Sequence, residues 1–208
     1  MEGIGVKRLS SSRLTCAIVA FGVVLGAEPA EAHLNSTGMG PIYDGLMHFL
    51  MSPEDIVPVL ALALLAGLRG ANFGRRALFV LPTAWFLGAL GGLSALAANP
   101  HPFLAAAWFL LLGGLVAADA NLSLRSTTAL AALLGLYHGY LNGTGLGQSL
   151  SIFVILLGLI FAIFVLIALV AAFVIRLRAS WARIAVRVAG SWIAACGLLM
   201  LGWAVRTR

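Results

Sequence analysis

Apolar residues along this chain gather in six long runs that only short polar connections interrupt. Each run is close to the roughly 20 residues that a helix needs to cross the hydrocarbon core of a bilayer. The connections leave no room for a separate soluble domain. We therefore predict an all-α membrane protein, a compact bundle of about six transmembrane helices, over residues 53–69, 77–97, 102–119, 127–144, 150–175 and 184–204.

A shorter apolar stretch near the start of the chain has the pattern of a secretory signal peptide. Lys7, Arg8 and Arg13 form a basic region, and the apolar segment CAIVAFGVVLGA is followed by Ala30-Glu31-Ala32, which offers small residues at a cleavage site. About 12 apolar residues are too few to span a bilayer comfortably. We therefore expect residues 1–32 to be cleaved and residues 33–208 to form a single transmembrane domain. An uncleaved anchor is the alternative.

Composition and charge agree with a bilayer as the surroundings. The chain is 62% hydrophobic and 10% charged, whereas a soluble domain carries about 25% charged residues. The net charge of +6 comes from basic clusters between the apolar runs. Such a pattern reports membrane topology, so we expect no nucleic-acid partner.

The positions of the arginines predict the orientation. With the mature N-terminus outside, the connections on the inner side hold eight arginines, and the two outer connections hold no Lys or Arg. Only Arg206 and Arg208, at the C-terminus, oppose this count. The positive-inside rule then predicts a bacterial inner-membrane protein with a periplasmic N-terminus. The eight are Arg69, Arg75, Arg76, Arg125, Arg176, Arg178, Arg183 and Arg187.

Glycines within the runs predict close contacts between helices. Gly88, Gly91 and Gly92, together with Gly113 and Gly114, put small residues on helix faces. Backbones can approach one another at such positions. We predict a packing role for these glycines and no chemistry.

Polar residues gather on the outer side of this predicted topology. All four histidines fall there, together with three carboxylates, and ionisable groups at membrane depth are expensive enough to indicate function. The residues are His33, His48, His101, His138, Asp44, Glu54 and Asp55. We therefore consider them as ligands for a cation.

The segment HFLMSPED, residues 48–55, also permits a plain structural interpretation. Ser52 as N-cap, Pro53 at the first helical position, and Glu54 and Asp55 in the first turn are favourable for starting a helix. Taken alone, the segment favours this interpretation over a ligand set. His101, between two prolines, is typical of a loop.

Spacing supports the ligand hypothesis. Asp44 and His48 are four residues apart, and Met51 and Asp55 continue their stripe if Pro53 only kinks the helix. His138 and Asn142 are also four residues apart. Imidazole with oxygen ligands suits divalent Ni, Zn, Cu or Fe. A transport site must also bind weakly enough to release its ion.

Three segments resemble the HupE/UreJ family of small membrane proteins: HFLMSPED, GRRALFVLPTAWFLGALGG and LYHGYLNG. The family is associated with hydrogenase and urease gene clusters and is regarded as a group of nickel permeases. Its first motif is H-P-x-x-G-x-D-H. His48 falls on the first histidine, Phe49 on the proline, Ser52 on the glycine, Glu54 on the aspartate and Asp55 on the second histidine.

The second family motif, H-G-x-A-H-G-x-E, falls on residues 138–145. His138 and Gly139 match its first pair, Asn142 stands at its second histidine, Gly143 keeps the glycine and Gly145 replaces the glutamate. The resemblance implies a metal site formed by Asp44, His48, Glu54, Asp55, His138 and Asn142. An aspartate in place of a histidine keeps an oxygen ligand, and an asparagine keeps a carbonyl.

The resemblance and the polar residues together predict a permease for a divalent transition metal, with nickel favoured, taken up from the periplasmic side. No cofactor would be tightly bound, and the ion would be cargo. The alternative is a non-transporting accessory subunit that assembles a membrane metalloenzyme complex. The expected partners are the lipid bilayer and the metal ion, with a second copy of the chain or a membrane-complex partner considered for either function. We do not expect an enzyme, because the sequence has no nucleophile elbow and only His138 lies clearly inside a predicted span.

Overall fold

The computed structural model describes residues 37–93, 101–146 and 150–206. The chain divides into a unit of residues 1–32 and a unit of residues 33–208, and all described residues belong to the second. The predicted signal peptide therefore lies outside the described residues, and its cleavage stays a prediction.

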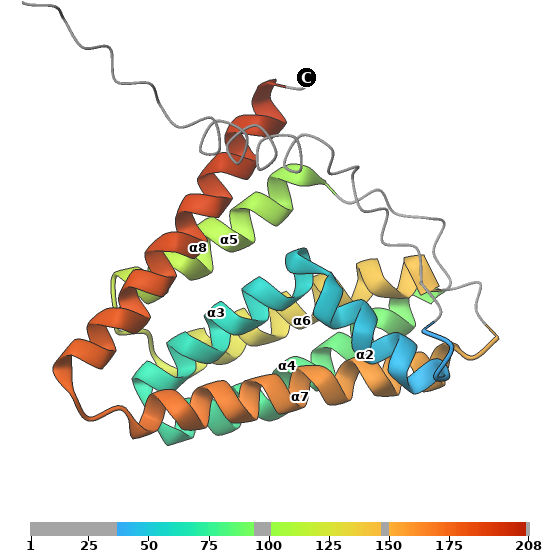
Figure 1. Ribbon diagram of the computed structural model, residues 1–208, viewed down its shortest axis with the longest axis horizontal. Helices are drawn as coiled ribbons and strands as arrows, with labels where there is room; N and C mark the ends of the chain where they lie inside the picture. Colours follow the sequence, from blue (N-terminus) through green and yellow to red (C-terminus); the bar gives the residue numbers. More distant parts are fainter. Residues whose placement is uncertain (1–36, 94–100, 147–149, 207–208) are drawn as a thin grey trace, which may run out of the picture. The chain divides into compact units, whose positions relative to one another are not determined.

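Helices make up nearly all of the described part, and no strand occurs in it. The predicted all-α class is confirmed. The helices are α2 (Pro41–Met51), α3 (Pro53–Arg69), α4 (Ala71–Leu93), α5 (Pro102–Ala117), α6 (Leu124–Leu146), α7 (Ile152–Arg176) and α8 (Ser180–Arg206) (Figure 1).

The first two predicted runs are separated by far less than the expected connection RGANFGRR. Gly70, whose φ is 108°, ends α3, and α4 begins at Ala71. A positive φ is readily available to glycine because it has no Cβ. The chain therefore turns within one residue, and Arg75 and Arg76 belong to the first turns of α4.

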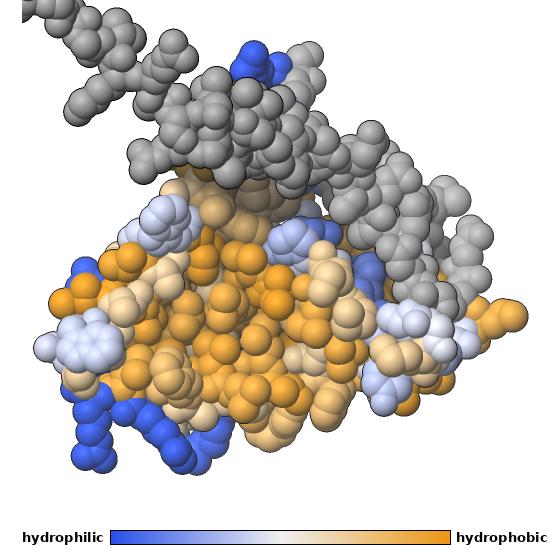
Figure 2. All heavy atoms as spheres, in the orientation of Figure 1, coloured by the Kyte–Doolittle hydropathy of each residue, from blue (hydrophilic) through white to orange (hydrophobic). Residues whose placement is uncertain are grey.

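Three helices are long and apolar enough to cross a membrane: α4, α7 and α8. The pair α2 and α3 also passes when taken together, although it is bent by 75° at the break between its helices. Figure 2 shows a broad apolar surface with hydrophilic side chains gathered at the end where α7 passes into α8. These features define an all-α membrane protein, and the crossing of all six predicted spans stays a prediction.

The helices pack against one another around a shared apolar core. α4 lies along α6, α5 lies along α8, and α7 contacts α2, α3 and α4 (Figure 1). The core between these helices contains Phe49, Leu62, Leu81, Trp85 and Leu134, all fully buried.

Glycines allow α4 and α6 to approach backbone to backbone. A Cβ at Gly88 or Gly92 of α4 would overlap backbone atoms of α6. The reverse holds for Gly135, Gly139 and Gly143, which follow one face of α6 against the backbone of α4. The packing role predicted for Gly88 and Gly92 is confirmed. Gly113 likewise meets α8, whereas Gly91 and Gly114 face open space, so the packing role predicted for those two is wrong.

We predict that Gly139→Ala destabilises the protein by about 1–3 kcal/mol, the usual cost of overpacking. The added methyl group would overlap the backbone of Trp85 and push α6 away from α4. Thermal unfolding in detergent measures the effect. Gly91→Ala is the matched control, because nothing lies within 4 Å of its Cβ position. Equal stability of both variants would contradict the close contact.

Candidate functional site

The site begins at a break in the chain between α2 and α3. Ser52 is extended there (φ −98°, ψ 93°), and its Oγ donates a hydrogen bond of 2.7 Å to the His48 carbonyl oxygen. Ser52 thus occupies the predicted N-cap position, but its side chain bonds backward to α2 and makes no cap bond to α3. Pro53 starts α3 as predicted.

This break contradicts the hypothesis that Pro53 only kinks one continuous helix. Because the two helices bend by 75°, Met51 and Asp55 do not share a stripe. Met51 is 69% exposed, whereas Asp55 is 4% exposed. His48 and Asp55 therefore reach the site from two separate helices, α2 and α3.

Four of the predicted ligand residues form one chain of hydrogen bonds between α2, α3 and α6. Asn142 stands at its centre: its Nδ2 donates to Asp55 Oδ2 at 3.0 Å, and its Oδ1 lies 3.0 Å from His48 Nε2. His138 Nδ1 lies 2.8 Å from Asp55 Oδ1. We call His48, Asp55, His138 and Asn142 the polar cluster.

The partners in the polar cluster determine which histidine nitrogens carry hydrogen. An amide oxygen only accepts, so His48 Nε2 donates to Asn142 Oδ1. A carboxylate also accepts, so His138 Nδ1 donates to Asp55. Asn142 Nδ2 makes a second bond, of 3.0 Å, to the His138 carbonyl one turn earlier in α6. Each hydrogen bond of the polar cluster therefore has a defined donor and a defined acceptor.

The other ring nitrogen of His138 has no partner. His138 is 2% exposed, and its Nε2 is buried without a hydrogen bond among the described residues. Its ring stacks on Trp85 with centroids 5.5 Å apart and meets the edge of Tyr137 at 5.1 Å. Trp108 lies 6.3 Å away. We call Trp85, Trp108 and Tyr137 the aromatic box. The buried Nε2 of His138 within this box is available as a ligand atom for a metal ion.

Asp44 and Glu54 have no hydrogen bond to the polar cluster. Asp44 Oδ1 accepts bonds from the Thr37 backbone N–H at 2.6 Å and from its Oγ1 at 2.7 Å. Glu54 is exposed in the first turn of α3. Within the described ranges, no three His, Cys, Asp or Glu side chains are arranged to hold a metal ion. His101 is exposed at the start of α5, and His33 lies outside the described residues.

Sequence reasoning missed the aromatic side chains around His138. Tyr137 is its chain neighbour, but Trp85 and Trp108 come from α4 and α5. The only signal for Trp85 is its place four residues after Leu81 and four before Ala89, on the buried face of α4. That signal predicts burial, not a contact with His138.

The fold and the site together describe an all-α membrane protein with a histidine and a carboxylate bonded to each other and buried among its helices. The model of the family described as HupE / UreJ protein matches residues 20–200, and the chain belongs to this family. Its members are generally linked to nickel or cobalt transport or to accessory functions, and they are not known as enzymes. Comparisons with curated proteins and with solved structures gave no significant match.

We predict that Asn142→Leu destabilises the protein by about 1–3 kcal/mol, because it leaves Asp55 Oδ2 and His48 Nε2 without their partner. Thermal unfolding in detergent measures the loss. Glu54→Gln, an exposed neighbour of Asp55, should change stability by less than about 0.5 kcal/mol. An Asn142→Leu variant as stable as the wild type would show that the polar cluster does not hold the helices together.

Proposed function

We propose that the protein is a permease for a divalent transition-metal ion, with nickel favoured, that takes the ion from the side where α2 and α3 meet. The observation that carries this proposal is the polar cluster with its unpartnered His138 Nε2. Polar and ionisable groups at membrane depth are costly and commonly line ion pathways. Membership of a family linked to nickel or cobalt transport supports the choice of ion.

Asp55 has a role in this proposal that differs from direct ligation alone. Metal-binding histidines usually donate their second ring N–H to a carboxylate, which fixes the tautomer and orients the ring. Asp55 holds His138 in this way, since Nδ1 donates to it and the lone pair is left on Nε2. His138 is thereby prepared as a ligand.

His48 is the half-buried member of the polar cluster and belongs to α2. We assign the first capture of the ion to His48 and Asp55, assisted by the Asn142 amide oxygen, and the next step to His138. Glu54, exposed one residue before Asp55, adds negative charge where the ion would enter, at the junction of α2 and α3. Asp44 would serve there too, once its bonds to Thr37 are released.

Transport is tested with the purified protein in proteoliposomes. We expect His138→Ala and His48→Ala each to lower the uptake of radiolabelled nickel at least about tenfold, because even the loss of an outer-shell partner of a metal site costs about 10–100-fold. His101→Ala, an exposed histidine outside the polar cluster, should leave uptake unchanged. Unchanged uptake in both cluster variants would exclude the proposed path.

One observation favours a second candidate function, a non-transporting accessory subunit. Among the described residues, all four polar-cluster side chains hydrogen-bond only to one another or to the α6 backbone, and these residues offer no ready three-ligand metal group. A cluster of this kind could serve only to fix the fold that a partner recognises. A stable partner that copurifies with the protein, together with no nickel flux by the isolated protein, would decide for this function.

A further inference from the structure

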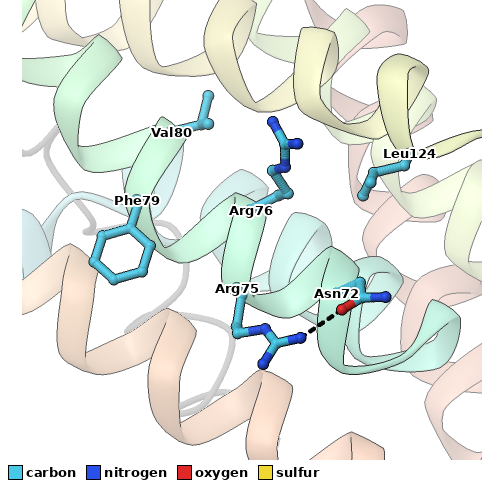
Figure 3. Close-up of a pocket in the computed structure, with 6 residues that line it drawn as sticks. All are labelled: Asn72, Arg75, Arg76, Phe79, Val80 and Leu124. Carbon is cyan, nitrogen blue, oxygen red and sulfur yellow. Dashed lines mark hydrogen bonds between the residues drawn. The ribbon is translucent and has the colours of Figure 1, made fainter.

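Two neighbouring surface pockets lie where α4 and α6 begin. The first is lined by Asn72, Arg75, Arg76, Phe79, Val80 and Leu124 (Figure 3). The second shares Arg76 and Leu124 and continues past Arg125 to Ala129 and Ala132 of α6. In Figure 3, Arg76 extends from α4 into the space beside Leu124, whereas Arg75 bonds to Asn72. Arg76 and Leu124 are therefore common to both pockets, and Arg76 brings the charge.

The arginines at these pockets have no anionic partner in the chain as described. Arg76 and Arg125 are exposed, and neither makes an ion pair or side-chain hydrogen bond among the described residues. The one described carboxylate at this end of the helices is Asp119, which is already paired with Arg69 and Arg183. Positive charge is thus left free at the pockets.

Away from the arginines, both pockets become apolar. Phe79 and Val80 continue α4, and Ala129 and Ala132 continue α6, about one to two turns beyond the basic residues. Small alanine side chains on α6 leave a shallow channel along the helix. The pockets therefore combine a cationic end with an apolar path that runs in the direction of the helices.

We propose that this surface binds an anionic phospholipid of the surrounding bilayer, with its phosphate between Arg76 and Arg125 and an acyl chain along Ala129 and Ala132. Basic pockets between transmembrane helices on the inner side of a membrane are suited to such headgroups. The arginine end of the helices is also the end that the positive-inside rule assigns to the inner leaflet. This inference does not depend on the proposed transport function.

Native mass spectrometry of the full-length protein tests the proposal, using nanodiscs of phosphatidylcholine and phosphatidylglycerol in equal parts. The wild type should retain phosphatidylglycerol in preference to phosphatidylcholine. Arg76→Gln with Arg125→Gln should lower that preference about thirtyfold, from two lost arginine–phosphate interactions. Arg176→Gln with Arg178→Gln is the matched control, because it removes the same charge at the same end outside both pockets.

A further variant separates the lipid from a free phosphate and keeps the test valid if the double arginine variant does not fold. Ala129→Phe should fill the apolar path and reduce lipid retention while every arginine stays in place. Retention of the preference in both pocket variants, or equal loss in the control pair, would overturn the proposal. Displacement of the bound lipid by millimolar inorganic phosphate would also overturn it, since it would assign the site to the free anion.

Discussion

The buried carboxylate of Asp55 is the group on which the arrangement of α2, α3 and α6 depends. Removing a carboxylate from water costs several kcal/mol unless it is paired and hydrogen-bonded. Asp55 meets this requirement with His138 on one oxygen and Asn142 on the other. Both partners belong to α6, so the depth and rotation of α3 relative to α6 are specified by two bonds at once. His48 is then attached through Asn142, and α2 is drawn into the same network.

Glycine contacts bring the helices close enough together for this network to form. Gly135, Gly139 and Gly143 bring α6 against the backbone of α4. His138 is next to Gly139 in the chain, so the same approach sets its ring on Trp85. A wider separation of the two helices would open the aromatic box and admit water to Nε2. The packing glycine Gly139 and the polar residue His138 therefore occupy adjacent positions of α6. The surroundings of His138 depend on the close helix contact that Gly139 allows.

The sequence predicts much of the fold and part of the site. Apolar runs indicate the helices because the bilayer leaves few alternatives for a backbone, and the spacing of His138 and Asn142 places both on one buried face of α6. The sequence could not show that Asp55 and Asn142, which stand where the family motifs have histidines, bond to each other. It also could not show the 75° break at Ser52, or the engagement of Asp44 by Thr37. Periodicity fixes the face of a helix, but crossing angles and the partner across an interface depend on tertiary packing.

The break at Ser52 divides the polar cluster between helices that pack against different neighbours. Asp55 and His138 lie on α3 and α6, whereas His48 lies on the 11-residue α2, which packs closely against α7 through Gly45 and Gly158. A rotation about Ser52 would change the separation of His48 from Asn142 and leave the Asp55–His138 pair in register. The position of the His48 imidazole thus depends on the contact of α2 with α7, while the position of the His138 imidazole depends on α3 and α4.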